Sequence, residues 1–110
     1  MNFSEMTGKD FEVLITPDEL DIKADDFDHI MTPDSMAWTK TIKDNWVYYQ
    51  VDKDEFSYSW EMQGIQMTFN PEMTYLKAKQ IVDEVVKKLT KYTREKVEAN
   101  FYPTDKIIQF

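Results

Sequence analysis

The sequence contains no cysteine and only two glycines. Without cysteine there are no disulfides and no thiolate chemistry, and any metal site would need histidine or oxygen ligands. Gly8 and Gly64 stand alone, whereas a phosphate-binding loop needs several glycines close together. The lack of cysteine fits a reducing compartment without requiring one.

Long apolar runs are also missing. The first residues do not show a basic stretch followed by an apolar one, so we expect no secretory signal. No apolar stretch approaches the roughly 20 residues that span a bilayer. We therefore expect a soluble, cytoplasmic protein that does not bind membranes.

Aromatic residues, in contrast, are plentiful. The 110 residues include seven Phe, six Tyr and three Trp, and 42% of the chain is hydrophobic. Aromatic side chains bury a large area each, so this composition can fill a core. We expect one folded domain over residues 1–110 rather than a disordered chain.

Negative charge is concentrated in the first third of the chain. Residues 1–36 hold ten acids and two bases, whereas residues 37–110 hold eleven of each. The whole net charge of −8 therefore arises before residue 37. A partner responds to this local field rather than to the total charge.

Alternating apolar and polar residues predict strands. The run at 11–16 predicts a first strand. Four further runs predict an antiparallel meander, at 35–42, 46–51, 56–62 and 65–69. Short polar turns separate them, centred on residues 44–45, 53–54 and 63–64.

These turns predict a register. The turn at 53–54 pairs Val51 with Phe56, and the turn at 63–64 pairs Met62 with Ile65. Opposed residues share a face, so one face is predicted to be apolar. It carries Val47, Tyr49, Val51, Phe56, Tyr58, Trp60, Met62, Ile65, Met67 and Phe69. The turn at 44–45 adds Met36, Trp38, Ile42 and also Lys40, a charge that suits this face only near the sheet margin.

A long helix is predicted over residues 71–93, with Asn70 as its cap and Pro71 at its first position. Apolar residues recur along it at helical spacing, so the helix should pack on the apolar face of the sheet. They are Tyr75, Ala78, Val82, Val85, Leu89 and Tyr92.

The last part of the chain is predicted to add a strand. Residues 96–101 alternate in strand fashion, although a continued helix stays open as an alternative. The apolar residues at 107–110 are expected to dock on the body. The predicted fold class is α+β, an antiparallel meander of about four to six strands in all with one long C-terminal helix packed on one face.

The acidic segment, residues 18–34, has no clear pattern. Thr16 can cap a short helix that begins at Pro17. In the next stretch, residues 21–34, apolar residues can pin the chain to the body as one or two helical turns or as an ordered loop; they are Ile22, Phe27, Ile30 and Met31.

Catalytic and metal-binding motifs are not found. The single histidine, His29, has no accompanying nucleophile motif. Asp25, Asp26 and Asp28 lack the glycine and the later glutamate of a calcium loop. We expect a protein that is not an enzyme and uses no cofactor and no metal. No motif covers enough of the chain to identify a family.

Direct nucleic-acid binding is also not expected. The lysines of the predicted helix alternate with acids, which is typical of a solvated helix face. The acidic first third would repel a phosphate backbone. A carboxylate surface that imitates such a backbone is compatible with the same residues.

Two groups of residues are candidates for partner binding. The first lies in the acidic segment, and the alternative for it is a solvated loop with capping aspartates. The second comprises two aromatics on the polar face of the sheet, which the N-terminal strand or the C-terminal tail could instead cover. Together they are Asp18, Glu19, Asp21, Asp25, Asp26, Asp28, Trp46 and Tyr48.

Three functions follow from these traits. The favoured hypothesis is a non-enzymatic acidic protein that inhibits or neutralises a macromolecular partner with a basic surface. Immunity proteins and phage-encoded inhibitors of host defence or nucleic-acid enzymes, DNA mimics among them, have such traits. The alternative is a structural or assembly subunit, for example of a homodimer. The third is a small enzyme or ligand binder with a pocket between sheet and helix.

Overall fold

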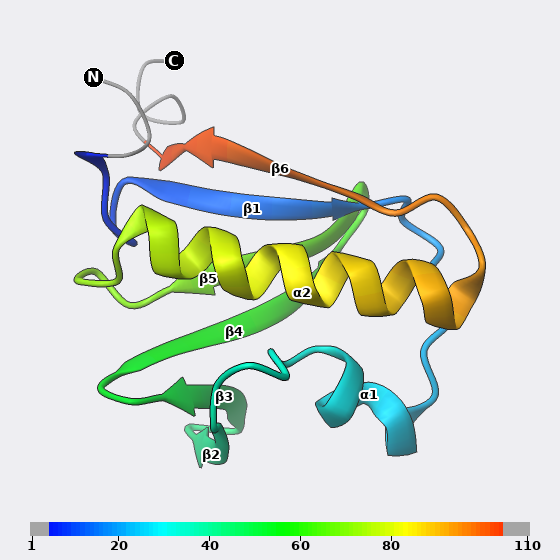
Figure 1. Cartoon of the computed structure of the whole chain (residues 1–110), viewed down its shortest axis with the longest axis horizontal. Coiled ribbons are helices and arrows are strands. Elements are labelled where there is room, and N and C mark those ends of the chain that lie inside the picture. The colour runs from blue at the N-terminus through cyan, green and yellow to red at the C-terminus, as the bar shows by residue number, and fades with distance from the viewer. Residues whose placement is uncertain (1–4, 105–110) are drawn as a thin grey trace.

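The computed structural model describes residues 5–104, which form one six-stranded antiparallel sheet and two helices (Figure 1). The elements follow in the order β1 (Phe11–Thr16), α1 (Ala24–Ile30), β2 (Thr39–Lys43), β3 (Trp46–Val51), β4 (Asp54–Glu61), β5 (Gly64–Phe69), α2 (Tyr75–Thr93) and β6 (Glu98–Pro103). The strand order in the sheet is β2-β3-β4-β5-β1-β6. The predicted α+β fold with a long C-terminal helix is confirmed.

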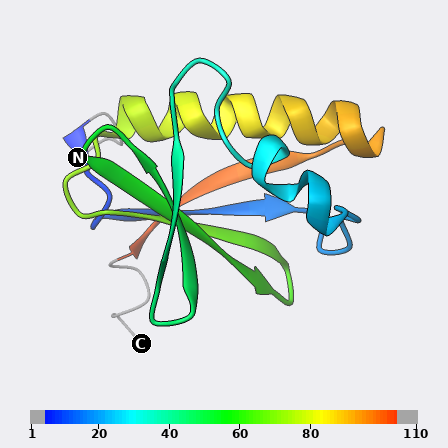
Figure 2. The ribbon, with the colours of Figure 1, turned by 90° about the horizontal axis from the view of Figure 1, so that it is seen from below.

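Helix α2 runs along one face of the sheet, and α1 lies below it, beside β3 and β4 (Figure 1). In a view turned by 90°, the strands of the strongly twisted sheet fan out beneath α2 (Figure 2). The buried stripe of α2 packs on the apolar face of the sheet and completes the core, with Ala78, Ile81, Val82, Val85 and Leu89. This is the packing that the helical spacing predicts.

The sheet is extended by strands from both ends of the chain. Strand β1 lies between β5 and β6 and pairs with both. Its inward side chains Val13 and Ile15 are fully buried. Residues 98–103 form a strand and do not continue the helix, so this open alternative is settled in favour of the strand. The expected docking of residues 107–110 lies outside the described residues.

Two of the three predicted hairpin registers are wrong by two residues. Val51 pairs with Asp54 instead of Phe56, because the turn uses Asp52 in a left-handed conformation, with φ of 56°. Glu61 pairs with Gly64, so the next turn also begins one residue earlier than predicted. An even shift leaves every side chain on its predicted face, which is why the core was still assigned correctly for most positions.

The first hairpin has the predicted register. Asp44 and Asn45 form its turn with φ of 53° and 65°, the conformation that a tight hairpin between twisted strands favours. Lys43 therefore pairs with Trp46, and Lys40 with Tyr49.

The predicted start of the long helix is wrong. Helix α2 begins at Tyr75, and the hydroxyl of Thr74 accepts the capping hydrogen bond from the backbone of Lys77 at 3.3 Å. The side chain of Asn70 is used elsewhere, because it accepts a hydrogen bond from the backbone of Glu55 and donates one to Asp54. Residues 70–73 thus form a turn that ties β4 to the helix.

The helix predicted to begin at Pro17 does not form. The Thr16–Pro17 peptide bond is cis, and residues 17–20 form a turn that returns the buried Leu20 to the core. A helix begins only at Ala24 and ends at Ile30, so part of the acidic segment forms helical turns.

Candidate functional site

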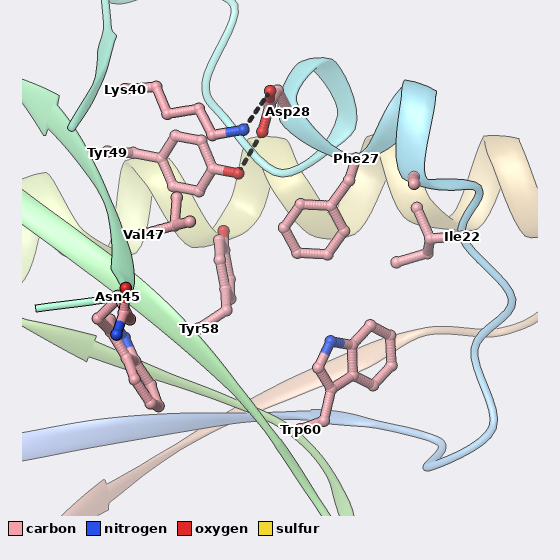
Figure 3. A pocket seen from close by; sticks show the side chains of 11 residues that line it. Ile22, Phe27, Asp28, Lys40, Asn45, Val47, Tyr49, Tyr58 and Trp60 are labelled. Carbon is pink, nitrogen blue, oxygen red and sulfur yellow. Dashed lines mark hydrogen bonds and ion pairs between the residues drawn. The ribbon is translucent and has the colours of Figure 1, made fainter. Parts of the chain in front are cut away.

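A cavity of about 470 Å³ lies between α1 and strands β2 to β4 (Figure 3). We call it the aromatic pocket. It is lined by Ile22, Ala24, Phe27, Asp28, Lys40, Asn45, Trp46, Val47, Tyr49, Tyr58 and Trp60. Pockets that hold small ligands or side chains have such volumes and are mostly apolar, with a few polar groups that fix orientation.

Aromatic contacts hold α1 against the sheet. Phe27 points from α1 towards β4 (Figure 3), and its ring meets that of Tyr58 edge to face, with 5.9 Å between centroids. The indole of Trp60 lies 6.4 Å from the ring of Phe27. Such ring pairs add about 0.5–1.5 kcal/mol each beyond their area burial. The walls of the pocket therefore also fix the position of α1.

Helix α2 holds α1 from the other side. The hydroxyl of Tyr92 donates a hydrogen bond to Asp26 at 2.8 Å. Lys88 donates to the backbone carbonyl of His29, in the last turn of α1, and to that of Thr32, just beyond its end. The ammonium of Lys88 complements the partly negative carboxyl end of the helix. The pocket is thus built from a helix that is bound on two sides.

The polar edge of the pocket is centred on Asp28. One carboxylate oxygen accepts a hydrogen bond of 2.5 Å from the hydroxyl of Tyr49, and the other accepts one of 3.0 Å from Lys40 (Figure 3). Partial burial raises the pKa of Asp28, whereas the hydrogen bonds from Tyr49 and Lys40 lower it. The lowering effect is the larger of the two, so the pKa of Asp28 lies below its usual value. Asp28 is therefore ionised at neutral pH.

The two tyrosines of the pocket are neutral donors. Burial, and then the hydrogen bond to Asp28, raise the pKa of Tyr49 far above its usual value. Burial likewise raises the pKa of Tyr58, whose hydroxyl donates to the backbone carbonyl of Met31 at 2.8 Å. The raised pKa values keep both hydroxyls protonated near neutral pH.

The two tryptophans of the pocket are open to solvent. Trp60 is 54% exposed and Trp46 is 45% exposed. Trp60 was predicted on the core face and does lie on that side of the sheet, but α2 does not cover it. Met62 was also predicted there and is 90% exposed, because it lies in the turn after β4. An exposed indole beside a cavity offers a ring face to a ligand.

The acidic candidates lie in the segment that leads into α1 and in α1 itself, and of them Asp28 lines the pocket. Asp18 and Glu19 lie in the turn after β1, Asp21 lies before α1, and Asp25 is in the first turn of α1. None of these four exposed side chains forms an ion pair or hydrogen bond within residues 5–104. Asp26 accepts a hydrogen bond from Tyr92, and Asp28 faces the pocket.

The two aromatic candidates are not brought together. Trp46 begins β3 and lies at the edge of the aromatic pocket. Tyr48 lines a small depression with Glu55 and other residues, and the ammonium of Lys43 lies 4.5 Å from the centre of its ring. Strand β1 lies within the sheet beyond β5, so it does not cover these side chains as one alternative supposed. The other alternative, cover by the C-terminal tail, falls mostly on residues 105–110, outside the described residues.

His29 does not line the pocket. Its ring meets that of Trp38 at 6.1 Å between centroids. Within residues 5–104, no three potential metal ligands (His, Asp or Glu) gather into a group that could hold an ion. The third hypothesis placed a pocket between the sheet and the long helix, whereas the aromatic pocket lies between the sheet and α1, and His29 does not line it.

Sequence reasoning missed Lys40 and Trp60 as pocket residues. The sequence did contain a signal for Lys40, because Lys40 was the single charged residue predicted on the otherwise apolar face of the sheet. That charge lies at the sheet margin and meets Asp28. No sequence signal indicated which part of the apolar face α2 would leave open.

No family model, curated protein or solved structure matches this chain. In the part of the chain that the structure describes, neither helix is long and apolar enough to span a membrane.

Proposed function

We propose that this protein is a non-enzymatic binding protein that docks on a basic surface of a macromolecular partner and blocks it. The observation that carries the proposal is a group of four exposed carboxylates at the start of α1 and in the segment before it, where Ile22 and Ala24 line the aromatic pocket; they are Asp18, Glu19, Asp21 and Asp25. Unpaired charges attract a partner of opposite sign and accelerate association.

The aromatic pocket supports the same proposal. Interface hot spots favour Trp and Tyr, and charged residues around them set the orientation of the partner. Here Trp46 and Trp60 are exposed at a cavity whose neighbouring helix begins with acids. The exposed rings therefore line the same pocket as residues of the acidic segment.

The test combines charge reversal with salt. The tagged protein is used to isolate its partner from the cell of origin, and affinity is then measured with the purified partner. Asp21→Lys with Asp25→Lys should weaken binding, and raising the salt should weaken wild-type binding, because about 1 M salt screens charges beyond roughly 3 Å. Both side chains are exposed, so melting should change little.

A matched control has the same change in net charge. Glu72→Lys with Glu95→Lys places two reversals in exposed positions at the two ends of α2. Equal loss in both double variants would contradict docking through the acidic segment. Assays of the partner's own activity, with and without this protein, test whether docking blocks it. A stable homo-oligomer without any captured partner would instead support an assembly subunit.

A small-molecule binder is the second candidate, and the cavity volume favours it. It predicts that a library of small ligands changes the fluorescence of Trp46 or Trp60, whereas no macromolecule binds. Capture of a macromolecular partner that is lost on charge reversal would argue against it.

A further inference from the structure

The aromatic pocket combines ring faces with one ionised carboxylate. Trp60 lies opposite Phe27, and Asp28 closes another side (Figure 3). Indole faces attract cations through their electron-rich centre, and this attraction is strongest for Trp. A carboxylate beside such faces adds a directional acceptor. The pocket therefore has the two parts that a cation-binding site needs.

A cation of the chain itself already occupies the carboxylate. The ammonium of Lys40 lies 3.0 Å from Asp28, and the side chain of Lys40 remains 42% exposed. A carboxylate offers about four lone-pair sites, and Tyr49 and Lys40 use two of them. A second cation can therefore share Asp28 or displace Lys40 from it.

The charges around the pocket select the sign of the ligand. Residues 18–30 contain six acids and one lysine, and the first turn of α1 presents Asp25 and Asp26. An anion would be repelled by these acids, and among the residues that line the pocket only Lys40 would attract it. A cation is attracted both by the surrounding acids and by the rings.

The shape of the site favours a planar cation. A guanidinium group stacks on an aromatic face and donates paired hydrogen bonds to a carboxylate, which a lysine ammonium cannot do. We propose that the aromatic pocket binds the guanidinium group of an arginine side chain that the partner protein presents. This inference rests on the proposed docking, and it names the contact that anchors it.

The experiment uses N-acetyl-arginine amide as the probe and the full chain labelled with ¹⁵N. The indole N–H signals of Trp60 and Trp46 report on the pocket directly, and that of Trp38 reports on its far side, because the ring of Trp38 lies 5.9 Å from that of Tyr49. N-acetyl-citrulline amide has almost the same shape without the charge. We expect saturable shifts for the arginine probe and binding at least about five-fold weaker for the citrulline probe, since the charge contributes to both contacts.

Two lysine variants separate a cation site from an anion site. Lys40→Gln removes the competing ammonium and should tighten binding of the arginine probe by about two- to five-fold, the range for an exposed ion pair. Lys43→Gln is the matched control, because it removes a lysine of the same strand that pairs with Glu55 at 3.0 Å, outside the pocket. It should leave probe binding unchanged.

Aromatic and acidic variants test the two parts of the site. Trp60→Leu and Asp28→Asn should each weaken the arginine probe. Trp60 is half exposed, and asparagine can still accept the hydrogen bond from Tyr49, so both variants should fold, which melting verifies. The Lys40→Gln result remains decisive if Asp28→Asn unfolds.

The inference is overturned if citrulline binds as well as arginine, or if Lys40→Gln weakens the arginine probe. Its failure is distinct from failure of the proposed function. Partner binding that is lost in the Asp21 and Asp25 reversal, but unchanged in Trp60→Leu, would retain the docking proposal and remove the guanidinium site.

Discussion

The hydroxyl of Tyr49 donates a hydrogen bond of 2.5 Å to the carboxylate of Asp28, and this bond joins the buried face of β3 to helix α1. Tyr49 is 2% exposed, so its hydroxyl has little access to water. The bond positions the carboxylate at the edge of the aromatic pocket. It thereby links the stability of the core to the geometry of the candidate site.

Tyr49→Phe tests this link. The variant keeps the ring and removes the donor, so the loss should be about 1.5–3 kcal/mol of unfolding free energy, typical for a hydrogen bond to a charged group. Urea denaturation at neutral pH measures it. The pKa of Asp28 should rise at the same time, because one of the two bonds that lower it is lost. An unchanged carboxyl titration would show that Asp28 does not depend on Tyr49.

Acid should destabilise the protein through two carboxylates. Partial burial raises the pKa of Asp54, whereas hydrogen bonds from Lys77 and Asn70 lower it by more. Its pKa therefore lies below the usual 3.8, as does that of Asp28. A lowered folded-state pKa gives stability that is present above the unfolded-state pKa and is lost as pH falls through the folded value. We therefore expect the unfolding free energy to fall below about pH 4. Asp54→Asn should flatten this fall, measured by denaturation at several pH values.

The ion pair between Asp54 and Lys77 should be strongly coupled. Lys77 donates to Asp54 at 2.7 Å, and the side chain of Asp54 is only 6% exposed. Lys77→Met leaves this carboxylate without its cation and should cost about 1.5–3 kcal/mol. Combining it with Asp54→Asn should cost less than the sum of the two single changes. Strict additivity in this double-mutant cycle would argue against the pairing.

Much of the fold could be predicted because alternation has a period of two. The faces of β3, β4 and β5 follow from it even though both registers were shifted by two residues. Face segregation cannot distinguish registers that differ by an even number. The left-handed conformation of Asp52 sets the register between β3 and β4, and the neighbouring residues do not indicate this conformation.

The pocket could not be predicted in the same way. One side of the pocket is formed by strand residues that were predicted on the apolar face, such as Tyr49, Tyr58 and Trp60. The opposite side is formed by α1. The position of α1 depends on contacts with residues far along the chain, such as Tyr92 with Asp26. The acidic segment was identified by composition, whereas its place beside the pocket is a tertiary property.

Capping of the long helix gives a further prediction. Thr74 caps α2, and its hydroxyl accepts the hydrogen bond from the backbone of Lys77. Thr74→Ala should lower the unfolding free energy by about 1 kcal/mol, whereas Thr74→Ser should retain most of the stability. Thermal or urea denaturation of both variants measures the difference. Equal losses would point to the methyl group of Thr74 rather than to its hydroxyl.

Gly64 is a position where an added methyl group should be poorly tolerated. Its φ of 154° is one that other residues rarely adopt, and a β-carbon there would lie 2.1 Å from the backbone oxygen of Ile15. That oxygen belongs to β1, which pairs with β5 in the middle of the sheet. Gly64→Ala must therefore separate the two strands, and we expect a loss of roughly 3 kcal/mol or more.

The neighbouring residue supplies the control for this change. Gln63 is exposed in the turn before Gly64, so Gln63→Ala should change stability by less than about 0.5 kcal/mol. Amide hydrogen exchange distinguishes local from global effects, since β1 and β5 should lose protection in Gly64→Ala before β2 and β3 do. Uniform loss across the sheet would mean that the β1–β5 pairing unfolds together with the rest of the sheet, and native-like protection would mean that the strands accommodate the methyl group.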